Sequence, residues 1–176
     1  MATTNWALEP THSELQFKVR HMMISNVTGS FGKFNGTVTT EGDDLTTAKV
    51  NFNIDVDSIS TNNEQRDGHL KSADFFDAAN HPQLVFESTE MKKESDENYK
   101  LHGNLTMRGV TKPVVLDVEY GGTINDPWGY TRAGFTIEGK VNRKDFGLAW
   151  SALTETGGLV VGDDVKIHGN VEFVKA

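Results

Sequence analysis

Apolar and polar residues alternate along most of this chain, and this period of two restricts its fold more than any other feature. In residues 13–22, Leu15, Phe17 and Val19 fall on one face of an extended chain, and charged or polar residues fall on the other. Such alternation is typical of strands with one buried face. It recurs at residues 34–39, 49–58, 83–89, 99–108, 114–120, 131–142 and 165–173. We therefore expect about eight strands.

These segments are separated by turn signals. Glycine, aspartate, asparagine and proline, which hairpin turns favour, gather at residues 41–44, 95–98, 125–129 and 161–164. Short turns between successive strands imply antiparallel, up-and-down order. A two-sheet sandwich is one outcome, but closure into a barrel removes the exposed edges that promote aggregation. We expect residues 1–176 to form a single all-β domain, an antiparallel up-and-down barrel.

Residues 64–86 interrupt the alternation. Arg66 to Asp74 can form two short helical turns, and Phe75 and Phe76 follow directly. A helix this short is stable only when packing holds it. We expect it to cap one end of the barrel and to lower at least one phenylalanine into the interior. The alternative is that both rings fill the core permanently and open nothing.

Residues 143–164 form a second interruption, which is too long for a hairpin loop. Connections of this length are usually lids, binding loops or disordered segments. Phe146, Leu148 and Trp150 argue against disorder, because such a segment is expected to be poor in large apolar residues.

Four predicted strands share a glycine at an inward position: Gly36, Gly103, Gly139 and Gly169. Inward glycines either let strands coil sharply enough to close a barrel or leave space that something else fills. Because each missing core methyl group costs about 1 kcal/mol, we favour a guest molecule. A barrel of about eight strands has room for one small ligand. A carrier should then enclose at least ~300 Å³.

The sequence carries no recognisable catalytic or metal-binding motif. Cysteine is absent, which excludes a thiolate nucleophile, a disulfide and a cysteine-based zinc site. The six histidines lack the spacing of metal ligands, and the phosphate-binding loop and the nucleophile elbow are missing. We expect a binding protein without metal or cofactor and not an enzyme. The enzymatic alternative uses His21, which lies on an apolar strand face, with a carboxylate such as Asp67.

Charge and hydropathy exclude several partners. The formal charge of −8 argues against nucleic acid and against an anionic membrane surface. No apolar run approaches the ~18 residues that a membrane span needs. The N-terminus shows no secretory leader, so we expect a cytoplasmic protein, or a periplasmic one if a leader has been removed. A homodimer is compatible with the sequence.

Five segments, in this order, resemble the YceI-like family of bacterial proteins over nearly the whole chain. They are Pro10 to His21, Gly29 to Gly36, Arg66 to Phe76, Gly103 to Pro113 and Asn142 to Gly147. The resemblance implies a lipocalin-like barrel with an elongated apolar interior that binds a polyisoprenoid or another long amphiphile. Many members of that family carry a leader and act in the periplasm.

Together these observations predict a protein that binds, stores or transports a hydrophobic small molecule of the polyisoprenoid or isoprenoid-quinone type. A stress-related or protein-interaction module with a filled barrel is the alternative. The candidate ligand-binding residues are Phe17, Val19, His21, Phe31, Phe34, Phe52, Ile54, Phe75, Phe76, Phe86, Leu105, Met107, Leu116, Phe135, Ile137 and Trp150. Arg20 or His21 is the candidate contact for a polar head near the rim.

Overall fold

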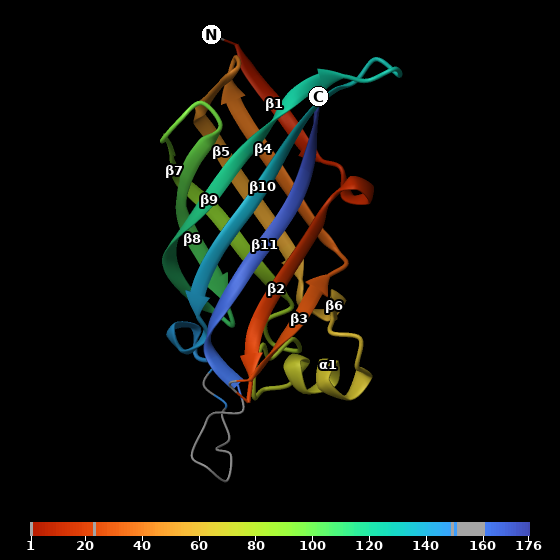
Figure 1. The fold of residues 1–176 in the computed structure, drawn as a ribbon, viewed down its shortest axis with the longest axis vertical. Coiled ribbons are helices and arrows are strands. Elements are labelled where there is room, and N and C mark those ends of the chain that lie inside the picture. The colour runs from red at the N-terminus through yellow and green to blue at the C-terminus, as the bar shows by residue number, and fades with distance from the viewer. Residues whose placement is uncertain (1, 23, 149, 151–160) are drawn as a thin grey trace.

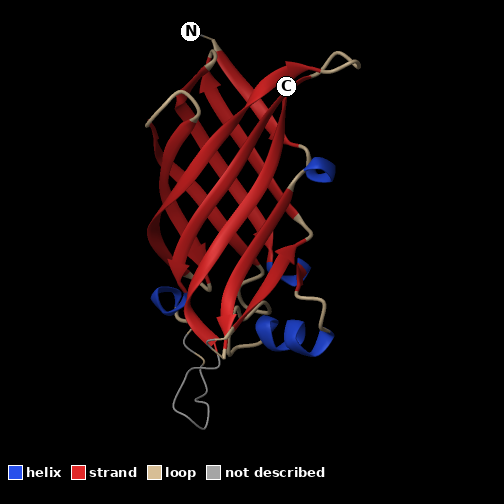
Figure 2. Cartoon of the chain, viewed as in Figure 1, coloured by secondary structure: helices blue, strands red, loops and turns tan. Residues whose placement is uncertain are grey.

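Strands dominate the computed structural model, which describes residues 2–22, 24–148, 150 and 161–176 (Figures 1 and 2). Within these residues an 11-stranded antiparallel sheet is joined by one α-helix. The strands are β1 (Thr3–Leu8), β2 (Glu14–His21), β3 (Ser25–Phe31), β4 (Phe34–Glu41), β5 (Asp44–Asp55), β6 (Ile59–Ser60), β7 (Gln83–Lys93), β8 (Asn98–Met107), β9 (Val110–Asn125), β10 (Thr131–Asn142) and β11 (Val161–Lys175). The helices are α1 (Glu64–Lys71) and the short 3-10 turns η1 (Pro10–His12), η2 (Val56–Ser58) and η3 (Arg143–Phe146).

The sheet closes on itself. Among the described strands, eight form a ring in the order β1-β4-β5-β7-β8-β9-β10-β11. The first strand of the ring completes the closure, because Trp6 lies opposite Val38 of β4 on one side and opposite Lys175 of β11 on the other. From β4 to β11, neighbours in the ring follow one another along the chain apart from the short β6. The predicted antiparallel, up-and-down barrel is confirmed.

Two strands share the long β11. Leu8 of β1 lies opposite Phe173, whereas β2 runs along the earlier part of β11 with Phe17 opposite Ile167. The η1 turn, with Pro10 at its start, makes the corner between β1 and β2. Both chain termini therefore lie at one end of the barrel and α1 lies at the other (Figure 1). We call these the upper and the lower end.

The strand predictions hold for all eight alternating segments, but two details differ. Strands β1 and β3 and the two-residue β6 lie outside the predicted segments. Residues 161–164, read as a turn, are the first residues of β11, and a register shift between Val161 and Val165 accommodates them. Asp163 is one of the residues that suggested a turn, but it forms an ion pair. Its carboxylate lies 3.3 Å from the ammonium nitrogen of Lys144.

Alternation decides which side chains form the core. Along β5, Val50, Phe52 and Ile54 are buried, and Asn51 and Asn53 between them are exposed. The same pattern recurs around the ring, so the buried faces of the strands meet inside the barrel. In the part of the chain that the structure describes, no helix has the length and apolar character to cross a membrane.

Helix α1 is fastened to the end of β6 by its own polar residues. It begins at Glu64 and ends at Lys71 rather than running from Arg66 to Asp74 as predicted. The Asn63 side chain caps it by accepting a hydrogen bond from the Arg66 backbone N–H at 3.0 Å. Thr61 donates its N–H and its hydroxyl to Asp67, at 2.8 and 2.6 Å. The Arg66 guanidinium donates to the Thr61 carbonyl at 2.7 Å. This network holds the cap at the lower end of the barrel (Figure 1).

Candidate functional site: an apolar cavity at the lower end of the barrel

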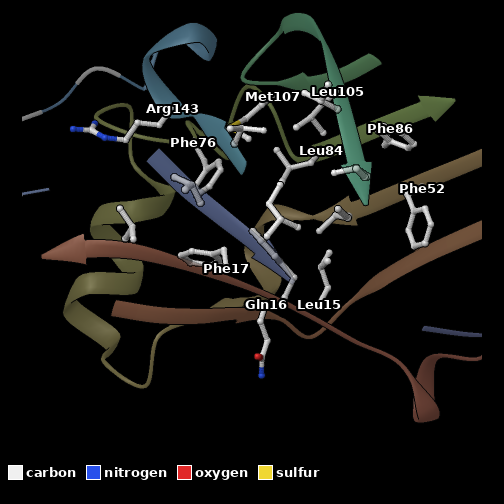
Figure 3. Close-up of a pocket in the computed structure, with 18 of the residues that line it drawn as sticks. Leu15, Gln16, Phe17, Phe52, Phe76, Leu84, Phe86, Leu105, Met107 and Arg143 are labelled. Carbon is white, nitrogen blue, oxygen red and sulfur yellow. The ribbon is translucent and has the colours of Figure 1, made fainter. Parts of the chain in front are cut away.

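The lower half of the barrel contains an apolar cavity of about 150 Å³ (Figure 3). Its walls come from strands around the barrel, from α1 and from the turn that follows α1. Two polar residues, Gln16 and Arg143, are among its neighbours, and the Gln16 side chain points away from the other labelled residues in Figure 3. The lining residues are Leu15, Gln16, Phe17, Val19, Phe31, Phe52, Ile54, Leu70, Phe75, Phe76, Leu84, Phe86, Leu101, Leu105, Met107, Val114, Leu116, Ile137, Val141, Arg143, Leu148, Val161, Val165, Ile167 and Val171.

The cavity is smaller than a carrier was expected to enclose. Its volume of about 150 Å³ falls short of the ~300 Å³ at which ordinary ligand pockets begin. A dry cavity of about 150 Å³ lined by leucine, isoleucine and phenylalanine holds one benzene-sized molecule. In this conformation the cavity therefore accepts a short apolar group, and a long tail requires the interior to widen.

Most of the candidate residues line this cavity. They come from distant parts of the sequence, and the barrel brings their inward faces together. The candidates that line it are Phe17, Val19, Phe31, Phe52, Ile54, Phe75, Phe76, Phe86, Leu105, Met107, Leu116 and Ile137.

Four candidates lie elsewhere. His21 is the last residue of β2 and Phe34 is the first residue of β4, so both stand at strand ends rather than around the hollow. Trp150 is not among the lining residues. Its ring packs on that of Phe75, with centroids 5.4 Å apart. Phe135 points inward as predicted, but it lines a second cavity in the upper half of the barrel. Alternation places a residue on a face and does not give its height along the barrel.

Most of the lining residues that were not among the candidates could also have been recognised from the alternation of apolar and polar residues. Leu84, Leu101 and Ile167 belong to the same alternating faces as the candidates next to them. Leu148 and Arg143 carried no such signal, because they lie in the irregular connection between β10 and β11.

Arg143 is a buried arginine that fastens this connection to the barrel. Only 3% of the residue is exposed. Its guanidinium donates to the carbonyls of Leu148 and Trp150, at 2.7 and 2.6 Å, and to the carbonyl of Gly162 at 2.9 Å. Five N–H groups are all that a guanidinium offers, and most of them are used by these carbonyls. Arg143 therefore positions backbone and has little hydrogen-bonding capacity left for a guest.

Burial also affects the acidity of this group. Burial lowers the pKa of the Arg143 guanidinium below its ordinary value, and the negative charge of Asp163 partly opposes this effect. The Asp163 carboxylate lies 3.8 Å from the guanidinium. The expected roles of residues 143–164 as a lid or binding loop fall largely on residues 149 and 151–160, which lie outside the described residues.

Large side chains cover the inward glycines. A Cβ atom on Gly103 would lie 2.4 Å from the Phe86 ring, and one on Gly36 would lie 3.1 Å from the Phe52 ring. Leu116 covers Gly139 in the same way. Aromatic cover of strand glycines is a known way to pack a barrel wall. The space was expected to be filled by a guest, and it is filled by neighbouring side chains. The same side chains, Phe52, Phe86 and Leu116, line the cavity.

Two rings close the cavity on the side of α1. Phe75 and Phe76 lie in the turn after the helix, are 5% and 9% exposed, and both line the cavity. Phe76 meets Phe31 edge-to-face, with centroids 6.2 Å apart. Phe75 packs against His69, whose ring nitrogen lies 2.8 Å from the Asp74 carboxylate. The cap therefore consists of an apolar inner layer and a polar outer layer.

The chemistry available in this cavity is the removal of an apolar group from water. Its lining is apolar apart from Gln16 and Arg143, so it offers burial and little hydrogen bonding. Within the described residues, no group of three or more histidine, aspartate or glutamate side chains could hold a metal ion.

Comparison with known proteins places the chain in a family. A model of the YceI-like domain matches residues 6–173. A UPF0312 protein of Pectobacterium atrosepticum is 44% identical over 140 residues, which cover 80% of this chain and 72% of that protein. The crystal structure of the Campylobacter jejuni YceI protein is 35% identical, with a TM-score of 0.76 over 87% of each chain.

A third similarity concerns the fold alone. A polyisoprenoid-binding domain from Saccharophagus degradans is 16% identical, with a TM-score of 0.68 over 96% of this chain and 97% of that one. The family model spans nearly the whole chain, and the relatives exceed 30% identity over most of its length. The chain belongs to the YceI-like family.

Proposed function

We propose that this protein binds an amphiphile with a long apolar tail, of the polyisoprenoid or isoprenoid-quinone type, and stores or carries it without covalent chemistry. The observation that carries the proposal is the cavity itself, which is lined by apolar side chains around the barrel and by the rings of Phe75 and Phe76. The Saccharophagus degradans domain with the same fold is described as polyisoprenoid-binding, which supports this class of guest.

The size of the cavity indicates how long the tail has to be. Each buried methylene group contributes about 0.8 kcal/mol, so a six-carbon group in the present cavity gains about 5 kcal/mol. Association itself costs about 4–15 kcal/mol. A short tail therefore binds weakly, and useful affinity requires a longer tail for which the interior widens.

Calorimetric titration with dodecanol tests this proposal, and β9 offers a matched pair of variants. Val114 lines the cavity, whereas its neighbour Val115 is 48% exposed on the outer face. Val114→Phe fills the cavity and should abolish binding. Val115→Phe adds the same ring outside and should bind like the wild type.

Two results would count against the proposal. One is the absence of dodecanol binding by the wild type, and the other is equal binding by both variants, which would place the guest outside the cavity. Turnover is tested in parallel, because formation of a product from a bound prenyl alcohol would contradict a purely binding function.

A second candidate, a protein-interaction module, is favoured by one observation. Ile124 and Trp128, on the hairpin between β9 and β10, are 66% and 76% exposed. Self-association through this hairpin predicts that the sedimentation coefficient rises with protein concentration and that Trp128→Ser removes the rise. A sedimentation coefficient that stays at the value of the monomer at every concentration would exclude a homodimer at this surface. Cytoplasmic location remains a prediction.

A further inference from the structure

The hairpin between β9 and β10 projects from the upper end of the barrel (Figure 1). It carries three of the six large apolar side chains that are exposed among the described residues. Ile124 is 66% exposed, Trp128 is 76% exposed and Tyr130 is 53% exposed. We call residues 124–130 the hairpin tip. Single exposed apolar residues are ordinary, but a cluster that contributes nothing to the core indicates a partner outside the chain.

A buried carboxylate holds the hairpin tip in its conformation. The Asp126 side chain is 4% exposed and accepts hydrogen bonds from the backbone N–H groups of Trp128 and Tyr130, each at 2.9 Å. The Arg132 guanidinium donates to the same carboxylate at 2.6 Å and to Glu172 of β11 at 3.0 Å. The two aromatic residues are therefore presented on an ordered support, so little conformational entropy is lost when a partner covers them.

The size of the hairpin tip limits the class of partner. Its two rings and Ile124 together expose on the order of 400 Å². A stable protein interface buries about 800 Å² on each partner, so two tips that met would form a contact no larger than crystal packing. A projecting tip of this size suits a membrane surface. There, tryptophan and tyrosine bury their rings and keep the polar N–H or O–H group among the head groups.

The charges of the hairpin tip favour a neutral membrane. Asp126 is the only charged residue in positions 124–130 of the sequence, and Arg132 is its ion-pair partner. The whole chain carries a charge of −8, which an anionic surface would repel. The tip therefore offers aromatic and apolar contact without a surplus of basic residues, which fits a zwitterionic lipid.

The hairpin tip stands beside the mouth of the upper cavity, whose volume is about 430 Å³. The cavity is lined by Tyr120 and Thr123 of β9 and by Thr131 and Ala133 of β10, the two strands that carry the tip. Asp96, an exposed residue between β7 and β8, also lines it, which places the mouth at the upper end of the barrel (Figure 1). A membrane bound by the tip therefore lies next to this mouth.

We infer that the hairpin tip docks the protein on a neutral lipid surface, with Ile124, Trp128 and Tyr130 at the boundary between head groups and acyl chains. The inference rests on the proposed function, because a carrier of membrane amphiphiles exchanges them with a membrane. It adds the surface that makes the contact and the class of lipid that it meets. Binding is peripheral and reversible, since three side chains reach only the edge of the acyl region.

Cosedimentation with phosphatidylcholine vesicles tests the docking. The wild type should pellet with the vesicles, and Trp128→Ala should lower its partition coefficient roughly tenfold or more, because the largest exposed ring is lost. Two isoleucines offer a matched pair. Ile124→Ser, in the tip, should weaken binding. Ile24→Ser, at an 84% exposed position between β2 and β3 at the lower end, should not.

Three results of this experiment would overturn the inference. The first is a wild type that does not associate with the vesicles. The second is association that Ile24→Ser weakens and Trp128→Ala does not, which would place the contact at the lower end. The third is a wild-type oligomer, in the absence of lipid, that Trp128→Ala dissociates, which would assign the tip to a second copy of the chain.

Fluorescence of a single tryptophan reports how deeply the tip enters the lipid. The chain has three tryptophans, so Trp6→Phe with Trp150→Phe leaves Trp128 as the only emitter. Its emission should shift to shorter wavelength with phosphatidylcholine vesicles. Lipid brominated near the head group should quench it more than lipid brominated near the end of the acyl chain. An unshifted emission from vesicle-bound protein would show that another surface makes the contact.

Titration with dodecanol separates a failure of this inference from a failure of the proposed function. Ile124 and Trp128 are not among the residues that line the two cavities, so the tip variants should bind dodecanol like the wild type. Dodecanol binding by a protein that does not associate with vesicles would refute the docking alone. Vesicle binding that requires Trp128, in a protein that does not bind dodecanol, would support the docking and refute the proposed function.

Discussion

Replacing Gly103 by alanine should both destabilise the barrel and reduce binding, because one methyl group would occupy the place of the Phe86 ring. The new Cβ atom would lie 2.4 and 2.7 Å from two atoms of that ring. It would also lie 2.6 Å from the Glu87 carbonyl oxygen, which belongs to the backbone of β7. The ring must turn away from the new methyl group, and the neighbouring strand must also move.

The expected magnitude follows from the cost of overpacking, which is about 1–3 kcal/mol. For a chain of this length each 1 kcal/mol lowers Tm by roughly 2–4 °C. Gly103→Ala should therefore lower Tm by about 2–12 °C. Phe86 lines the lower cavity, so its displacement should also weaken dodecanol binding.

Differential scanning calorimetry with and without dodecanol measures both effects. Gly134→Ala is the control, because a Cβ atom there meets nothing within 4 Å. That substitution should leave Tm unchanged or raise it slightly, since alanine loses less chain entropy on folding than glycine does. Equal Tm values for the two alanine variants would refute the conclusion that Phe86 lies on Gly103.

Three further predictions concern the cap, the buried arginine and the upper hairpin. Phe76→Ala should lower the free energy of unfolding by about 3–5 kcal/mol and bind dodecanol in the vacated space, so saturating dodecanol should reduce the loss of Tm. Equal losses with and without dodecanol would argue that Phe76 is a permanent plug. Arg143→Leu leaves the carbonyls of Leu148 and Gly162 without their donor, at about 1–3 kcal/mol for each unsatisfied group. Lysine at this position should restore little of the loss, because it lacks the planar fork, and a full recovery of Tm would contradict this. For Asp126, burial raises the pKa, but hydrogen bonds from Arg132 and from the backbone N–H groups of Tyr130 and Trp128 outweigh it and hold the pKa below its ordinary value. A depressed pKa means that this stabilisation is present above the unfolded-state pKa and is lost as the pH falls through the folded-state pKa. Asp126→Asn should therefore lower Tm at neutral pH and converge with the wild type in acid, and a loss that does not vary with pH would exclude this mechanism.

The barrel was predictable because alternation is a local signal that burial on one face imposes on every strand. Segments with few apolar residues do not show this alternation, so they were not predicted to be strands. β3 reads SNVTGSF, and its inward positions include Gly29 under the Phe17 ring. In β1, Trp6 and Leu8 are the only large apolar residues, and the pairing with β4 and β11 makes this segment a strand. Pairing partners lie far away in sequence, so alternation could not reveal them.

The cavity was only partly predictable because packing depends on register. Alternation shows that Gly36 and Phe52 face inward, but only the pairing of β4 with β5 sets them opposite each other. In that pairing the Phe52 ring covers Gly36 and fills the space expected at the glycine. The cavity is therefore smaller than expected. Phe135 faces inward too, yet its height on β10 assigns it to the upper cavity. Arg143 could not be identified as a lining residue from the sequence. A buried arginine that donates to backbone carbonyls cannot be distinguished there from an exposed arginine in a loop.

Native mass spectrometry of the freshly purified, unsubstituted protein tests the central claim most directly, because it asks whether the interior holds a lipid in the cell. The account predicts a species heavier than the polypeptide by the mass of one amphiphile. That species should disappear after extraction with organic solvent and return when a prenyl alcohol is added. A spectrum that shows the bare polypeptide alone, both before extraction and after addition of the alcohol, would contradict the account.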